Sequence, residues 1–163
     1  MKRSLFSLVL AVTFMAGFTS AVHAQQDLED LFKTAQVNYM MIDTGFYSFP
    51  YEVDDVTITI YARMRVLYGS IPEESRTLML WTKSLALPKN FNLSVPFLTA
   101  LAQMNDDAPY GSYSLDKDKT LIYSNISLRM ADSNPDLLNM VCYSLLQMRA
   151  YVRNTLGPYL DEG

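Results

Sequence analysis

Hydrophobic and polar residues alternate most regularly over positions 56–69, and this alternation predicts the clearest strand of the chain. The apolar positions of the alternation are Val56, Ile58, Ile60, Ala62, Met64 and Val66. The positions between them are Thr57, Thr59, Tyr61, Arg63 and Arg65. A period of two places these sets on opposite sides of a β-strand, so we expect a sheet with one covered face and one more polar face.

A helix and an irregular strand are predicted before this alternating segment. The helix covers 27–37, because its apolar residues follow helical spacing, at Leu28, Leu31, Phe32 and Ala35. The segment 39–53 is rich in aromatic and β-branched residues, which favour strands. We expect this strand to bend or break near Asp43–Gly45 and to resume at Phe46.

The strand predicted over 76–87 differs from its neighbour because bulky apolar residues point to both of its faces. Leu78 and Leu80 share one face, and Met79 and Trp81 share the other. Such a strand is either central and buried on both sides, or its second face contacts something outside the domain.

Two further helices and a hairpin complete the predicted order. A helix over 95–105 has Ser94 as its N-cap, and a helix from 132 to 157 opens with Ser133 or Asn134 as the cap. Between the helices, strands over 110–115 and 120–128 flank four polar residues that suit a hairpin loop. The predicted fold class is α+β, in the order α-βββ-α-ββ-α, with helices packed on an antiparallel sheet.

The first 24 residues have the pattern of a signal peptide. Lys2 and Arg3 precede an apolar run over 5–18 that is short for a membrane span, and Ala24 ends an A-x-A-like cleavage site. A retained membrane anchor is the alternative. We expect cleavage after Ala24, a periplasmic or secreted protein without stable membrane insertion, and a single domain over 25–163.

Loss of the leader narrows the possible chemistry. His23 is the only histidine, so the mature chain has no histidine base and no histidine ligand for zinc. Cys142 is the only cysteine and lies in an apolar helical pattern, so we expect it to be buried. Without Lys2 and Arg3, eleven basic residues face seventeen acidic ones, a formal charge of −6 that disfavours nucleic acid as a partner. Catalysis by carboxylate, tyrosine, lysine or serine side chains is what remains, and a histidine-free hydrolase stays an alternative; we predict no cofactor and assign no catalytic residues.

Four aspartates within thirteen residues form the remaining candidate for metal or acid chemistry: Asp106, Asp107, Asp116 and Asp118. A calcium loop of the EF-hand type needs oxygen ligands and a glycine at fixed positions, and neither possible register provides them. Two lysines also interleave with the hairpin aspartates. We interpret the four residues as a helix end and a hairpin loop, and we predict no metal site.

The polar side of the alternating strand is the candidate binding surface. Tyr61, Arg63 and Arg65 project to one side, and Trp81 extends this set if its face of the next strand lies beside it. The row is either an ordinary polar sheet face, with Trp81 in the core, or a recognition patch for an acidic partner. We predict these four residues as partner-binding residues.

The stretch 105–128, with Asn105, 110-YGSYSLD-116, the hairpin and 121-LIYSNISL-128, resembles the YbjN-like family, as do residues 28–39 and Tyr159 after the last helix. The fold of that family is similar to that of type III secretion chaperones. The resemblance implies a non-enzymatic protein-binding or regulatory role, with a possible homodimer. The export signal departs from the many cytoplasmic members. The alternative function is binding of a small apolar ligand in a Met- and Tyr-lined pocket between sheet and helices.

Overall fold

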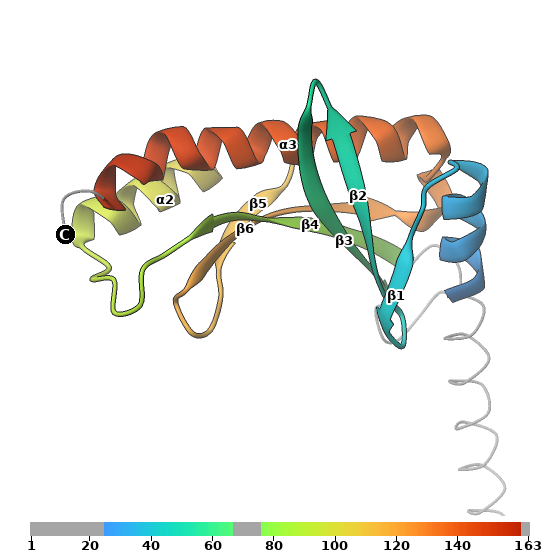
Figure 1. Ribbon diagram of the computed structural model, residues 1–163, viewed down its shortest axis with the longest axis horizontal. Helices are drawn as coiled ribbons and strands as arrows, with labels where there is room; N and C mark the ends of the chain where they lie inside the picture. Colours follow the sequence, from blue (N-terminus) through green and yellow to red (C-terminus); the bar gives the residue numbers. More distant parts are fainter. Residues whose placement is uncertain (1–24, 67–75, 161–163) are drawn as a thin grey trace, which may run out of the picture.

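A six-stranded antiparallel sheet forms the framework of the protein, which we describe from a computed structural model over residues 25–66 and 76–160 (Figure 1). The predicted signal peptide and the turn predicted over 69–75 lie outside the described residues. The strand order in the sheet is β1-β2-β3-β4-β6-β5. The strands are β1 (Met40–Asp43), β2 (Phe46–Val53), β3 (Val56–Val66), β4 (Arg76–Ala86), β5 (Ser112–Leu115) and β6 (Leu121–Arg129).

The helices agree with the predicted order, and local signals fix where they begin. They are an N-terminal helix over 25–34, α2 (Val95–Asp107) and α3 (Pro135–Leu156), with short 3-10 helices at Met130–Asp132 and Gly157–Leu160. Ser94 caps α2 by accepting a hydrogen bond from the backbone N–H of Phe97 (3.4 Å). Asn134, rather than Ser133, caps α3 by accepting from the N–H of Leu137 (2.9 Å). The α+β fold class is confirmed.

The segment predicted as one broken strand forms two strands that pair with each other. The break does fall at the predicted place, where Gly45 adopts a φ of +73°. The chain reverses there, so that Met40 lies opposite Ser48 and Met41 opposite Tyr47. Glycine favours this turn because it reaches positive φ without a steric cost. The hairpin places β1 at one edge of the sheet.

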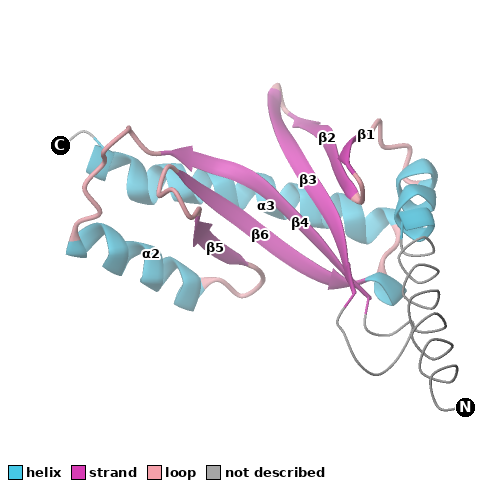
Figure 2. Ribbon diagram, turned by 90° about the horizontal axis from the view of Figure 1, so that it is seen from below, coloured by secondary structure: helices cyan, strands magenta, loops and turns pink. Residues whose placement is uncertain are grey.

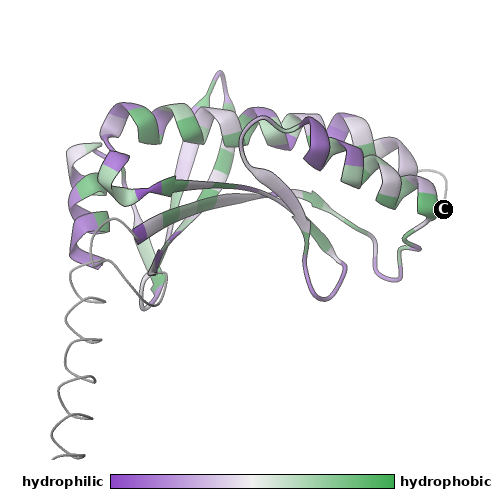
Figure 3. Ribbon diagram, turned by 180° about the vertical axis from the view of Figure 1, so that it is seen from behind, coloured by the Kyte–Doolittle hydropathy of each residue, from purple (hydrophilic) through white to green (hydrophobic). Residues whose placement is uncertain are grey.

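The helices lie on one side of the sheet, and their apolar residues form two cores with the inner sheet face (Figures 1 and 3). The first core joins the N-terminal helix, β2–β4, β6 and the first half of α3. The second joins α2, β5, β6 and the second half of α3. Between them along the strands lie three buried polar residues, Thr82, Ser84 and Ser124, of which Ser84 and Ser124 share a hydrogen bond of 2.6 Å.

Two of the residues that carry the sequence resemblance fix the path of the chain at β5. Asn105 at the end of α2 accepts from the N–H of Tyr113 (2.7 Å) and donates to the carbonyl of Tyr113 (3.1 Å), so it joins α2 to β5. Gly111 precedes β5 with a φ of +91°, and a Cβ atom there would collide with the carbonyl oxygen of Asn125. These residues therefore have structural roles.

Candidate functional site

The outer face of the sheet is not covered by any element that the structure describes. Figure 2 shows this face toward the viewer, with β4 and β6 in front of α3. The strand register places one row of side chains across it. From β1 to β5 this row is Met40, Ser48, Tyr61, Trp81, Asn125 and Ser112.

Three aromatic rings at the centre of this face pack against one another. The rings of Tyr61 and Trp81, which are opposite each other on β3 and β4, stack with centroids 5.9 Å apart and planes inclined by 18°. Phe46 on β2 meets Trp81 edge to face, also at 5.9 Å. Offset stacking and edge-to-face contacts are the favoured geometries of aromatic pairs. All three side chains are half-buried, although none of the described helices covers them.

Two cations lie over these rings. The guanidinium carbon of Arg63 is 4.6 Å from the centroid of Phe46, and Nζ of Lys83 is 5.5 Å from the centroid of Tyr61. Exposed cation–π contacts of this kind contribute about 0.5–1 kcal/mol each. Within 25–66 and 76–160, neither cation has a carboxylate oxygen within 4.0 Å. The surface formed by Phe46, Tyr61, Arg63, Trp81 and Lys83 is called the aromatic–cationic cluster below.

Three of the four predicted binding residues belong to this cluster, and the fourth lies beside it. Tyr61, Arg63 and Trp81 come together because β3 pairs with β4 in the register that places Tyr61 opposite Trp81. Arg65 projects from the same face two residues further along β3, opposite Thr77. The structure places Trp81 on the outer face, outside both cores.

The sequence prediction missed Phe46 and Lys83. Lys83 could have been found, because it lies two residues after Trp81 on a strand and therefore shares its face. Phe46 could not, because its place beside Arg63 depends on the pairing of β2 with β3. The exposed apolar run of Met40, Met41 and Ile42 on the edge strand β1 was missed for the same reason.

The four aspartates of the acidic stretch lie where they were predicted, at a helix end and a hairpin loop. Asp106 and Asp107 are exposed at the end of α2, and Asp118 is exposed in the hydrophilic tip between β5 and β6 (Figure 3). Asp116 accepts hydrogen bonds from the N–H groups of Thr120 (2.6 Å) and Leu121 (2.9 Å). Desolvation acts to raise the pKa of Asp116, but these hydrogen bonds outweigh it and lower the pKa below its usual value.

Cys142 and the potential metal ligands among the described residues show no reactive or metal-binding arrangement. Cys142 is buried as predicted, and this burial raises the pKa of its thiol to about 12, so the group is protonated at neutral pH. Among the described residues, no three His, Cys, Asp or Glu side chains converge to hold a metal ion. No described helix combines the length and the apolar character that a membrane span requires.

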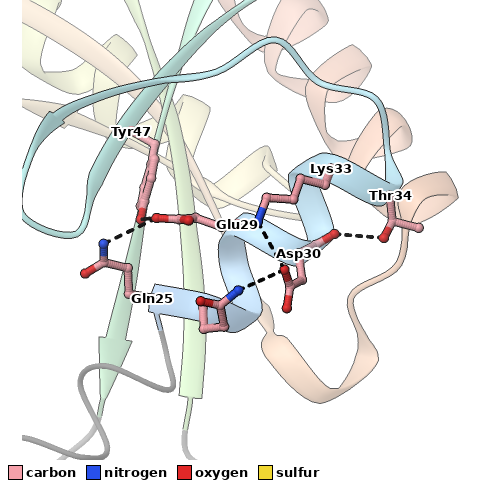
Figure 4. A network of polar contacts seen from close by, with 7 residues as sticks. Gln25, Glu29, Asp30, Lys33, Thr34 and Tyr47 are labelled. Carbon is pink, nitrogen blue, oxygen red and sulfur yellow. Dashed lines mark hydrogen bonds and ion pairs between the residues drawn. The ribbon is translucent and has the colours of Figure 1, made fainter.

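A polar network joins the N-terminal helix to β2 (Figure 4). The hydroxyl of Tyr47 donates to a carboxylate oxygen of Glu29 (2.8 Å), and the side-chain amide of Gln25 also donates to Glu29 (3.3 Å). Burial, followed by the bond to Glu29, raises the pKa of Tyr47 above its ordinary value. The network joins the helix to β2 and so fixes the position of the helix on the sheet.

One hollow that the described residues form between sheet and helices is small. It has a volume of about 280 Å³ and lies beside the N-terminal helix, β2 and the start of α3. Its apolar lining includes Val37, Phe49, Leu138 and Cys142, with Tyr51 and no methionine. This lining differs from the Met- and Tyr-rich pocket that the ligand-binding alternative predicts.

Comparison with known proteins identifies the fold. Neither a protein-family model nor a curated protein matches the sequence. The structure is similar to a chain of the HopA1–SchA chaperone–effector complex, with a TM-score of 0.51 and 15% identity over 85% of this chain and 97% of that chain. A chain of the complex between the Yersinia pestis type III secretion chaperone SycH and a stable fragment of YscM2 gives a TM-score of 0.49 and 14% identity, covering 78% and 98%. The first likeness confirms the predicted secretion-chaperone-like fold, and membership of the YbjN-like family stays a prediction.

Proposed function

We propose that this chain is a non-enzymatic, chaperone-like protein that binds another protein through the outer face of its sheet. The observation that carries the proposal is the aromatic–cationic cluster on a face that no described element covers. Tyr, Trp and Arg are the residues most enriched among those that dominate binding energy at protein interfaces. The fold is shared with a chain from a chaperone–effector complex, and this likeness supports a partner that is itself a protein.

The charge of the face favours an acidic partner. The whole chain carries a formal charge of −4, yet Arg63, Arg65 and Lys83 lie together on the outer face. A local positive patch on an acidic protein steers acidic partners toward the patch and repels basic ones.

The proposal also includes the compartment and the assembly of the protein. We propose that the leader is cleaved after Ala24, that the mature protein is periplasmic or secreted, and that two copies can form a homodimer.

Capture of partners from extract tests this function. Wild-type protein and the Arg63→Glu/Arg65→Glu variant are produced with the leader, purified and incubated with periplasmic extract. The matched control is Lys89→Glu/Lys117→Glu, which reverses two exposed charges in the loop after β4 and in the β5–β6 loop, outside the aromatic–cationic cluster. We expect a captured protein that the control retains and the Arg63/Arg65 variant loses by about tenfold or more, because each reversal turns attraction into repulsion. Identical capture by all three proteins would refute binding at this face.

A further inference from the structure

One arginine lies on the side of α3 that faces the sheet, within a row of buried apolar residues. These residues follow one another at helical spacings of three, four or seven: Leu138, Val141, Leu145, Val152 and Leu156. Arg149 is four residues after Leu145 and three before Val152, so it belongs to the same row. Leu145 is part of the first core and Val152 is part of the second, so Arg149 lies at the boundary between the two cores.

The guanidinium of Arg149 is only partly in solvent, and its charge is unpaired among the described residues. Its Nε atom is enclosed and has no hydrogen-bond partner there. Within 25–66 and 76–160, no carboxylate oxygen lies within 4.0 Å of its nitrogen atoms. Burial, followed by the nearby charge of Arg153, lowers the pKa of Arg149 below its usual value. Partly buried charges are normally paired, so this environment favours a ligand of opposite charge.

A second guanidinium lies one helical turn further along α3. Arg153 follows Arg149 by four residues, a separation that places two side chains about 5–6 Å apart at Cβ on one helix face. Nε of Arg153 donates to the carbonyl of Ser84 on β4 (3.2 Å). Ser84 lies beyond Ile60 and Thr82, the last pair that joins β3 to β4, so β3 does not use this carbonyl (Figure 2). The bond holds one side of the Arg153 guanidinium against β4 and leaves its two Nη groups to donate elsewhere.

Arg76 shows how the fold pairs a buried guanidinium with one of its own residues. The Arg76 side chain is 11% exposed and forms an ion pair with Asp27 of the N-terminal helix. Its Nε atom is enclosed without a partner, like that of Arg149, so the ion pair is what distinguishes the two arginines. The charged neighbour of Arg149 is Arg153 instead of a carboxylate. This contrast supports a ligand as the counter-charge of Arg149.

Two guanidiniums on one helix face suit an oxyanion. Like charges at this spacing destabilise a helix, and a bound anion offsets their repulsion. We propose that Arg149 and Arg153 bind a phosphate group at the boundary between the two cores. A phosphate group has enough acceptor oxygens to bond both guanidiniums in the bidentate geometry that arginine favours, whereas a carboxylate has two oxygens and occupies one guanidinium. The site lies on the helix side of the sheet, so this inference does not rest on the proposed function.

Thermal unfolding of the purified protein in different anions tests this site. Inorganic phosphate is compared with chloride and acetate at equal ionic strength and at millimolar concentrations, at which general effects of phosphate on stability are small. Phosphate at about ten times its dissociation constant should raise the thermal midpoint by about 3–5 °C relative to chloride. Acetate, with a single charge and two oxygens, should raise it by about 1 °C or less. Equal midpoints in phosphate and chloride would overturn the inference.

Two substitutions separate the site from an effect of net charge. Arg149→Met should abolish the phosphate-induced shift, and its midpoint in chloride should equal or exceed that of wild type because a partly buried, unpaired charge is removed. The matched control Arg129→Gln removes an exposed arginine that pairs with Asp132 (3.0 Å), and it should retain the full shift. Loss of the shift in the control as well would show that only net charge matters, and the inference would fail.

Nuclear magnetic resonance of the wild type tests the site without any substitution. The proton–nitrogen signals of the Nε–H groups of Arg149 and Arg153 should move saturably during titration with inorganic phosphate, and that of Arg129 should not. Glycerol phosphate is titrated in parallel. Tighter binding of this ester supports a phosphate group carried by a larger molecule, and tighter binding of inorganic phosphate supports the free ion. No saturable change at Arg149 and Arg153 with either probe would show that the site does not exist.

Discussion

The two faces of the sheet are built from the same strands and differ in what stabilises their side chains. On the inner face, one row consists of Tyr47, Ala62, Leu80 and Ile126, all buried beneath α3 and the N-terminal helix. On the next row of the outer face, Tyr61 and Trp81 are half-buried, and among the described residues they pack against each other and against Phe46. The inner face is stabilised by helices, and the outer face by contacts within the sheet.

The contacts within the sheet allow an open face to carry aromatic residues without exposing a large continuous apolar surface to water. Stacking removes part of each ring from water, and the cations of Arg63 and Lys83 cover further ring area. The side chains are thereby held in place before any partner arrives. Such pre-organisation reduces the conformational entropy that is lost on binding.

The largest expected difference between the faces is in the loss of stability caused by substituting two adjacent residues of β4. Leu80→Ala leaves a cavity in the first core, where the side chain is fully buried, and should lower the free energy of unfolding by about 2–5 kcal/mol. Met79→Ala, on the outer face and half-buried, should lower it by about 1 kcal/mol or less. Urea denaturation followed by circular dichroism measures both values. Similar losses would show that the outer face is also covered in solution.

A smaller difference in stability is expected between alanine substitutions at two glycines with positive φ. Gly111→Ala would place Cβ against the backbone of β6 and within 3.1 Å of Met148 on α3, in addition to the strain of φ +91°. Gly45→Ala meets no atom within 4 Å at the β1–β2 turn and carries only the conformational strain, about 1–2 kcal/mol. We expect Gly111→Ala to lower the thermal midpoint more than Gly45→Ala. An equal shift would mean that the contacts at Gly111 relax without cost.

The smallest contrast compares two tyrosine hydroxyls. Tyr47→Phe removes the hydrogen bond to Glu29 at the inner face and should cost about 1–2 kcal/mol. Tyr61→Phe, on the outer face, should change the stability by less than about 0.5 kcal/mol.

The same pair of variants also predicts a pH dependence. Because the pKa of Tyr47 is raised in the folded protein, its contribution is complete below the ordinary tyrosine pKa of about 10 and is lost as the pH rises above it. Wild type and Tyr61→Phe should therefore lose stability between about pH 10 and 11 more steeply than Tyr47→Phe. Parallel curves for all three proteins would contradict this role of Tyr47.

The sequence was sufficient to predict what depends on local periodicity. The alternation at Ile58, Ile60 and Ala62 identified the inner face of β3, and the caps at Ser94 and Asn134 marked the starts of α2 and α3. These features depend on neighbouring residues of one segment, so a single sequence contains them.

Features that depend on pairing between distant segments could not be predicted in the same way. The sequence did not decide whether Trp81 lies on the covered or the open side of β4, because both faces of this strand carry apolar residues. The pairing of β4 with β3 and the position of α3 decide this. The contact of Phe46 with Arg63 requires the β2–β3 register, which depends on the hairpin between these strands. The sequence therefore predicted the residue types of the candidate site, but it identified only some of the residues that form it.

The residues that form the first core determine when, during synthesis, the chain can complete its fold. It joins Leu28, Leu31 and Phe32 near the start of the domain to Leu138, Val141 and Leu145 in α3. These partners are separated by more than a hundred residues, and contacts of such long sequence separation slow folding because the loop must close before they form. A chain that emerges from its amino end cannot complete this core until α3 has emerged as well. Until then the N-terminal helix has no α3 to pack against, and the domain acquires its native structure only once nearly its whole length is available.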